Sequence, residues 1–207
     1  MSESEKISYL NAKIRKEPNN ADLFFKRSET LFKKGELTEA YSDIEKAILI
    51  DKKKVEYHVL KADILFTQGD TDLAFSALQT AKEVDGKYIE AYLKSAELSL
   101  YLKDYEKTMF DVKQAIIIDK LNPTAYFLRG WALKEQGDTI NAVKDYQKAI
   151  ELKSDYEQAY EELGVPDIVR RMTYQPQGLI LVTGKTNSGK TTTLNALINE
   201  INETQNK

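Results

Sequence analysis

Apolar residues recur along most of this chain at the three- and four-residue spacing of amphipathic helices, and the helical stretches come in pairs. A glycine and an acidic residue separate the two stretches of most pairs, as at Gly35-Glu36 and Gly69-Asp70. Glycine suits the left-handed residue that ends a helix, and a carboxylate suits the start of the next helix. The pattern therefore predicts helix–turn–helix units joined by short loops.

The pairs repeat with a fixed period of 34 residues, which defines four units at 21–54, 55–88, 89–122 and 123–156. Certain positions keep their character in every unit. In the first helix an aromatic residue or histidine (Phe24, His58, Tyr92, Tyr126) is followed four residues later by a small one (Ser28, Ala62, Ala96, Gly130). The turn falls at Gly35, Gly69, Lys103 and Gly137, each followed by an acidic residue. In the second helix a larger residue stands between two small ones. The larger residues are Ile44, Leu78, Val112 and Tyr146. The small residues before them are Ala40, Ala74, Thr108 and Ala142, and those after them are Ala47, Ala81, Ala115 and Ala149.

A 34-residue period with these positions resembles the tetratricopeptide repeat (TPR). Small residues belong where two helix backbones approach closely, because one more methylene would overpack the contact. A single helix pair cannot bury its own apolar face, so the units must stack on one another. We therefore expect an all-α fold, a TPR superhelical solenoid, over about 1–164.

Shorter segments flank the four repeats. Ile7, Leu10 and Ile14 lie at helical spacing and predict that 1–20 forms an N-terminal capping helix with its polar side in solvent; a frayed tail is the alternative. A fifth repeat begins at 157 and is broken at Val165-Pro166, so 157–164 is expected to be the closing helix.

The TPR resemblance implies a groove lined by the first helix of each repeat. In this chain the residues at the groove positions of the family are Phe25, Glu29, Phe32, Val59, Asp63, Phe66, Leu93, Glu97, Tyr101, Phe127, Trp131 and Lys134. This apolar and aromatic stripe edged with carboxylates would suit a protein or peptide partner with a short apolar segment and a few basic residues. Helical spacing alone does not separate such a groove from an ordinary packed and solvated face, so both interpretations stay open. Phe25 and Glu29 replace the Lys and Asn with which one TPR variant grips chaperone C-termini, so we do not expect that role.

A different pattern follows Pro166. An apolar run of strand type, 178–183, leads into G-x-x-x-x-G-K-[ST], and a helical pattern comes next. The motif residues are Gly184, Lys185, Thr186, Asn187, Ser188, Gly189, Lys190, Thr191 and Thr192. Strand, loop and helix in this order predict a phosphate-binding loop, with Lys190 on the β/γ-phosphates and the Thr191 hydroxyl on Mg²⁺.

Residues 163–204 resemble the PilT-like retraction ATPases of type IV pili, although Lys185 and Asn187 replace a proline and a glycine of that family. The resemblance implies ATP or ADP with Mg²⁺ as ligand. The sequence ends at Lys207, so we expect 165–207 to be a truncated P-loop segment without the family's Walker B strand and downstream catalytic groups, and therefore no ATP hydrolysis. The alternatives are a nucleotide-binding ATPase segment with the repeats as its targeting arm, an inert remnant, or a segment through which copies self-associate.

Composition narrows the remaining possibilities. The 30 basic and 33 acidic residues are well mixed and give a net charge of −3, which argues against nucleic-acid binding. Without cysteines there is no disulfide or thiolate metal site, and no apolar run is long enough to span a membrane. No secretory leader is visible, so a cytoplasmic location is expected. We expect His58 to pack, Glu161 and Glu162 to be solvated, and no catalytic group or required cofactor. The sequence thus favours an interaction scaffold.

Overall fold

The structure, a computed structural model, describes residues 1–164, and every element of this part of the chain is an α-helix. The strand expected at 178–183 lies outside the described residues. The helices are α1 (Glu3–Lys16), α2 (Ala21–Lys34), α3 (Leu37–Ile50), α4 (Val55–Gln68), α5 (Thr71–Val84), α6 (Ile89–Tyr101), α7 (Tyr105–Ile118), α8 (Pro123–Glu135), α9 (Thr139–Leu152) and α10 (Glu157–Glu162). None of these helices combines the length and the apolar character that a membrane crossing requires.

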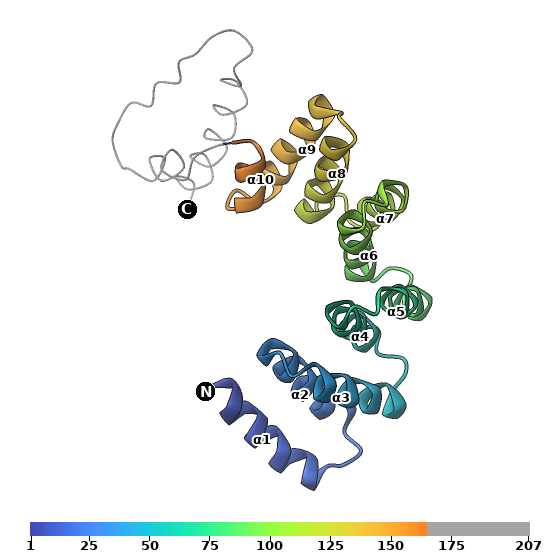
Figure 1. Cartoon of the computed structure of the whole chain (residues 1–207), viewed down its shortest axis with the longest axis vertical. Helices are drawn as coiled ribbons and strands as arrows, with labels where there is room; N and C mark the ends of the chain where they lie inside the picture. The colour runs from blue at the N-terminus through green and yellow to red at the C-terminus, as the bar shows by residue number, and fades with distance from the viewer. Residues whose placement is uncertain (165–207) are drawn as a thin grey trace, which may run out of the picture. The chain divides into compact units, whose positions relative to one another are not determined.

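The chain divides into two compact units, with the boundary inside α6. Unit 1 is Met1–Ser95, and unit 2 begins at Ala96. Within unit 1, α2 pairs with α3 and α4 pairs with α5, while in unit 2 α8 pairs with α9 and α10 follows against α9 (Figure 1). The all-α class and the paired-helix repeats expected from the sequence are confirmed for the described residues.

The turns between paired helices have the backbone conformation that the sequence predicts. Gly35, Gly69 and Gly137 have φ of +83°, +92° and +86°, in the left-handed region. Lys103, which occupies the same turn in the third pair, also has a positive φ, of +61°. The repeat register, rather than the presence of glycine, therefore dictates this conformation, and Lys103 adopts it against the usual preference of a residue with a Cβ.

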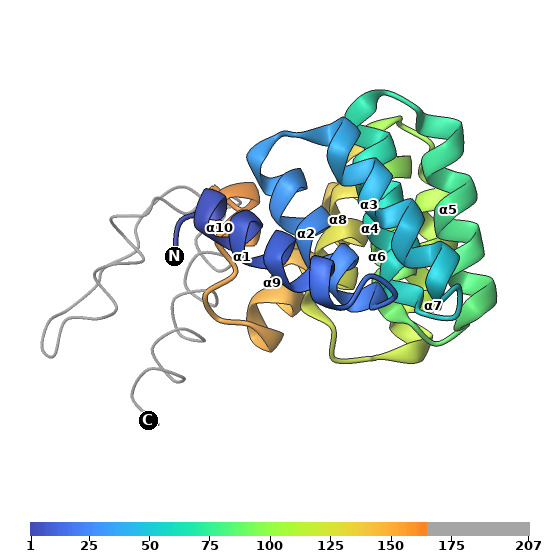
Figure 2. The same ribbon diagram turned by 90° about the horizontal axis from the view of Figure 1, so that it is seen from below.

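The first helix is ordered and packs against α2 (Figure 2). Its N-terminus has a capping box, in which the Ser2 hydroxyl accepts a bond of 3.3 Å from the Glu5 N–H and the Glu5 carboxylate accepts one of 2.7 Å from the Ser2 N–H. Leu10 is buried, and Ile7 and Ile14 pack against the core of unit 1. Residues Glu3–Lys16 thus form a helix that packs on the first repeat.

The positions that keep the same character in all four repeats form the core. Ile44, Leu78, Val112 and Tyr146 are at most 2% exposed, and the small residues that flank them in the second helices are at most 1% exposed. The small positions of the first helices are equally buried, so each repeat is held by close contact between its two helices. This packing fixes the direction in which each first helix presents its other side chains.

Candidate functional site

Close contacts inside each repeat hold the first helix, which carries the candidate groove. In the first repeat the buried Ser28 hydroxyl donates a 2.7 Å hydrogen bond to the carbonyl of Ala40 on the facing helix. In the fourth repeat Gly130 leaves space for the ring of Tyr146: a Cβ on Gly130 would lie 2.8 Å from Tyr146 Cε1. The size of the residue on one helix is therefore matched to its neighbour on the other.

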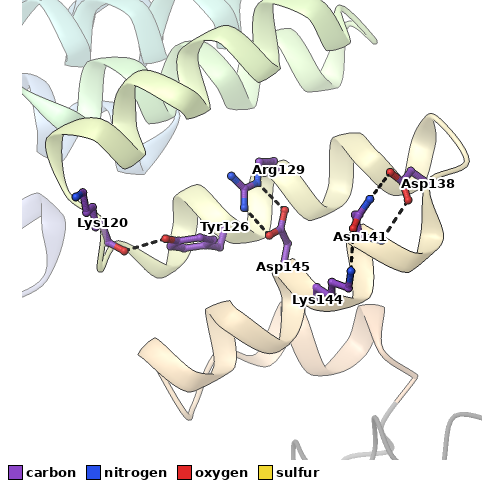
Figure 3. A network of polar contacts seen from close by, with 7 residues as sticks. All are labelled: Lys120, Tyr126, Arg129, Asp138, Asn141, Lys144 and Asp145. Atoms are coloured by element: carbon purple, nitrogen blue, oxygen red, sulfur yellow. Dashed lines mark hydrogen bonds and ion pairs between the residues drawn. The ribbon is translucent and has the colours of Figure 1, made fainter.

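A partly buried arginine–aspartate pair reinforces this contact in the first and fourth repeats. Arg27 donates from Nε and Nη2 to the carboxylate of Asp43 at 2.5 and 2.6 Å, and Arg129 makes the same pair of bonds to Asp145, both at 2.7 Å (Figure 3). Both bridges are bidentate and link the first helix of the repeat to the second. Arg27 Nη1 also donates to Asn11 Oδ1 at 2.6 Å, which ties α1 to the first repeat.

The sequence did not lead us to expect these bridges. Their residues are 16 positions apart, at the seventh and twenty-third places of a repeat, so they do not share a helix face. The signal that was available is the recurrence of Arg and Asp at these two places in the first and fourth repeats. The hydrogen bond to Asp145 raises the pKa of the Arg129 guanidinium above its ordinary value.

The start of α9 is held by a polar cap (Figure 3). Asp138 accepts a hydrogen bond of 3.2 Å from the Asn141 N–H and one of 2.7 Å from the Asn141 side-chain amide, and Lys144 donates to the Asn141 Oδ1 at 3.3 Å. Bonds from the Asn141 side chain and backbone lower the pKa of the Asp138 carboxyl. Asp104 also caps its helix, whereas Glu36 and Asp70 make no side-chain cap bond, so the expected role of the turn acids holds for half of them.

In unit 1 the candidate groove residues lie on α2, α4 and the start of α6. Phe25, Glu29 and Phe32 follow one another at helical spacing along one face of α2, and all three are half-buried. The equivalent residues of α4 are the buried Val59 and the half-buried Asp63 and Phe66, while Leu93 of α6 is buried. The structure thus leaves aromatic and carboxylate side chains partly accessible on adjacent first helices.

Three contacts bring these first helices together within unit 1. The rings of Phe25 and Tyr57 lie 4.9 Å apart, and the Tyr57 hydroxyl donates a 2.5 Å hydrogen bond to Asp22. Burial, and then this bond, raises the pKa of Tyr57 well above its ordinary value. Asp63 of α4 pairs at 3.3 Å with Lys94, so part of its negative charge is already neutralised.

An open pocket of about 500 Å³ adjoins the Tyr57–Asp22 bond. The residues that line it come from the loop before α2, the end of α3 and the start of α4, and they include Glu17, Asp22 and Asp51. Lys54 also lines the pocket, so these carboxylates share it with a cation beside the N-terminal ends of α2 and α4.

In unit 2 the candidate residues divide into accessible and buried ones. Glu97, Tyr101, Trp131 and Lys134 are exposed, and Tyr101 is 74% exposed. Phe127 is buried in an aromatic cluster, with its ring 6.1 Å from Trp131, 5.8 Å from Tyr146 and 5.1 Å from Tyr156. Trp131 is therefore supported from beneath by Phe127 while its own surface stays open.

Lys134 has a partner that the sequence did not indicate. Its ammonium group lies 2.6 Å from the carboxylate of Glu162 on α10, and the Tyr146 hydroxyl lies 3.4 Å from the same carboxylate. The expectation that Glu162 is solvated is wrong, because α10 folds back and places it between these two groups; Glu161 is exposed as expected.

Other candidate chemistry is limited in the described part of the chain. His58 is 7% exposed, and its Nε2 lies 3.0 Å from the carbonyl oxygen of Lys52, which fits the packing role expected for it. Residues 1–164 contain no cluster of three histidines and acidic residues that could hold a metal ion. The phosphate-loop residues, 184–192, lie outside the described residues.

Comparison with known proteins identifies both patterns found in the sequence. Residues 21–54, 55–88 and 123–156 match the family model of the tetratricopeptide repeat. Residues 142–207 match the model described as type II/IV secretion system protein. The third helix pair, 89–122, falls between the matched repeats.

Two curated relatives match the chain over 45 residues. One is a "Twitching motility protein" of Neisseria gonorrhoeae, 58% identical over 22% of this chain and 12% of the relative. The other is "Type IV pilus retractation ATPase PilT" of Pseudomonas aeruginosa, 49% identical over 22% of this chain and 13% of the relative. The chain therefore spans about an eighth of the length of these relatives.

Solved TPR structures share the fold of the described helices. The crystal structure of MamA has a TM-score of 0.63 and 23% identity and covers 73% of this chain and 89% of that chain. YrrB, "a TPR protein with an unusual peptide-binding site", has a TM-score of 0.60 and 16% identity over 75% and 80% of the two chains. A thermophilic TPR protein of Thermus thermophilus reaches a TM-score of 0.65 at 16% identity, over 75% and 86%.

Proposed function

Because residues 21–54, 55–88 and 123–156 are tetratricopeptide repeats, we propose that this chain is a protein-interaction scaffold that binds a peptide segment of a partner through its first helices. The partner segment carries apolar or aromatic side chains together with a few lysines or arginines. Its apolar groups pack against the half-buried aromatic side chains, and its cations face the carboxylates.

One observation carries this proposal. On α2 a carboxylate, Glu29, lies between two half-buried phenylalanines, Phe25 and Phe32, and α4 repeats the arrangement with Asp63 before Phe66. Partly buried aromatic side chains are held rigidly and lose little entropy when a ligand covers them. Carboxylates at a regular spacing then fix the register of the bound segment through charge complementarity.

A peptide selection tests the proposal. A random peptide library displayed on phage is panned against the full chain, and the enriched sequences are expected to combine apolar residues with Lys or Arg. Glu29→Lys is expected to abolish binding of the enriched peptides, because it places a cation where the peptide's own cation would lie. Glu39→Lys is the matched control, since Glu39 is exposed on the second helix α3. Equal binding by both variants would refute a role for the first-helix face.

A second function is favoured by the match of 142–207 to type II/IV secretion proteins and by the short stretch of high identity to pilus ATPases. It is nucleotide binding at Gly184–Thr192, with the Lys190 ammonium on the phosphates and the Thr191 hydroxyl on Mg²⁺. The repeats would then serve to bring this segment to a partner.

Calorimetry with Mg²⁺-ATP separates this function from the first. Heat of binding by the full chain that Lys190→Ala removes would support a nucleotide site, because the lysine ammonium is the principal cation of such loops. Lys185→Ala changes another loop lysine and is the matched control. Absence of heat in the unmodified chain would refute nucleotide binding and leave the scaffold proposal untouched.

A further inference from the structure

The outer face of α7 carries an apolar stripe in solvent. Phe110 and Ile117 are 62% and 61% exposed and lie seven residues apart on one side of this helix. Leu102, in the turn before α7, is 46% exposed, and Leu121, in the loop after it, is 69% exposed. Large apolar side chains that gather on one face in solvent mark an interaction surface more often than scattered ones do.

This stripe is specific to the third repeat. At the equivalent positions the other repeats carry polar residues in all but one case: Lys34, Gln68 and Gln136 for Leu102; Ser42, Ser76 and Lys144 for Phe110; Leu49, Glu83 and Glu151 for Ile117; Lys53, Lys87 and Asp155 for Leu121. The third repeat is also the one that falls between the segments matched by the TPR family model. The fold therefore does not require these apolar residues, because the other repeats form the same helix pair with polar residues at all of these positions except Leu49.

Charged residues on the same face make the stripe self-complementary. Glu106 lies four residues before Phe110, and Lys113 lies three residues after it; both are exposed. When two copies of this face meet antiparallel, each acidic position of one copy therefore comes opposite the basic position of the other.

We propose that the outer face of α7 is the contact surface of a two-fold symmetric dimer of this chain, with α7 of one copy packed antiparallel against α7 of the other. Phe110 lies at the symmetry axis and stacks on its equivalent. Glu106 of each copy faces Lys113 of the second copy. The first helices stay free of this contact, so the inference goes beyond the proposed peptide binding and is independent of it.

The dimer is expected to be weak. One 14-residue helix from each copy spans about 21 Å and carries few apolar side chains, so the interface is smaller than that of a permanent complex. We therefore expect a monomer–dimer equilibrium that depends on protein concentration.

Sedimentation velocity on the full chain, across roughly two decades of concentration, tests the proposal. Phe110→Ser, which installs the residue of the first two repeats, is expected to raise the dimer dissociation constant at least about tenfold, because each dimer loses two buried rings. Ile140→Ser is the matched control: Ile140 is 73% exposed on α9, outside this face, and its loss is expected to leave dimerisation unchanged. A chain that stays monomeric throughout, or a dimer that Phe110→Ser leaves intact, would overturn the proposal.

A charge-reversal experiment distinguishes the symmetric pairing from any other arrangement. Glu106→Lys and Lys113→Glu each place like charges opposite one another, so each variant alone is expected to be monomeric. A mixture of the two is expected to form heterodimers, because every lysine then faces a glutamate of the other variant. If the mixture stays monomeric while the unmodified chain dimerises, the antiparallel α7 pairing is wrong. If the stripe is instead covered by another protein or by residues 165–207 of the same chain, the unmodified chain stays monomeric and the proposal fails.

Discussion

Replacing Gly130 with alanine tests whether close helix contact sets the geometry of the fourth repeat. The added Cβ would lie 2.8 and 2.9 Å from two ring carbons of Tyr146 and 3.1 Å from the carbonyl oxygen of Ala142. These distances are shorter than van der Waals contact, so atoms must move. The ring cannot easily yield, because Tyr146 is 2% exposed and packs against Phe127 at 5.8 Å.

The expected magnitude follows from two opposing effects. Overpacking of a core contact costs about 1–3 kcal/mol, and contacts this short belong in the upper part of that range. Alanine in place of glycine within a helix stabilises the folded state by about 1 kcal/mol through its higher helix propensity. We therefore expect Gly130→Ala to lower the free energy of unfolding by about 1–2 kcal/mol.

Urea unfolding followed by circular dichroism measures this change. Gly86→Ala is the control, because a Cβ at Gly86 would lie 3.6 Å from its nearest neighbour, an ordinary contact. In a Tyr146→Leu background the Gly130→Ala cost is expected to fall by about 1 kcal/mol or more, since the second repeat already pairs Ala62 with Leu78. If Gly130→Ala leaves the stability unchanged or raises it, or if its cost is the same in both backgrounds, the size-matching argument is refuted.

Three further predictions concern the same framework. Arg129→Lys is expected to lower the free energy of unfolding by about 1 kcal/mol in the same urea assay, because lysine cannot make the bidentate bond to Asp145. An unchanged free energy of unfolding would mean that the bridge does not stabilise the repeat. Lys103→Gly is expected to stabilise the chain by about 1 kcal/mol by relieving a positive φ, whereas Gly69→Ala is expected to destabilise it; the same sign for both in thermal unfolding would contradict this. The pKa of the Asp138 carboxyl is lowered in the folded state. Its contribution to the free energy of unfolding is therefore present above the unfolded-state pKa and is lost as the pH falls through the folded-state pKa. The stability difference between the unmodified chain and Asp138→Ala is thus expected to shrink below about pH 4, and a constant difference would contradict the assignment.

The repeat period predicted the core correctly because each of its positions has one steric requirement. A small residue at the eighth place and a larger one at the twenty-fourth follow from helix contact alone. The register also placed Lys103 at the turn, where the structure gives it a positive φ. Such local rules are visible in a sequence because the same requirement recurs every 34 residues.

The remaining features depend on contacts that do not recur in every repeat. The Arg27–Asp43 and Arg129–Asp145 bridges occur in only two repeats, and the Glu162 contact depends on the way α10 returns toward Lys134. Burial of Phe127, in turn, depends on Tyr156 in the loop beyond its own helix pair. Spacing within one helix carries no information on such long-range neighbours, so the accessible part of the candidate groove could not be separated from its buried part.

The bridged repeats are the first and fourth. In the second repeat the corresponding positions are Lys61 and Ala77, and in the third Ser95 and Asp111. The bidentate ion pair therefore reinforces the two repeats whose sequence supplies both of its partners.

The measurement that tests the scaffold proposal most directly is the location of a bound peptide on the chain. Backbone amide NMR shifts of the full chain are followed during titration with a peptide enriched in the selection. The proposal predicts shifts concentrated on α2 and α4, around Glu29 and Asp63, with α3 and α5 unaffected. Shifts confined to α3 and α5 would place the binding surface on the second helices and contradict the account.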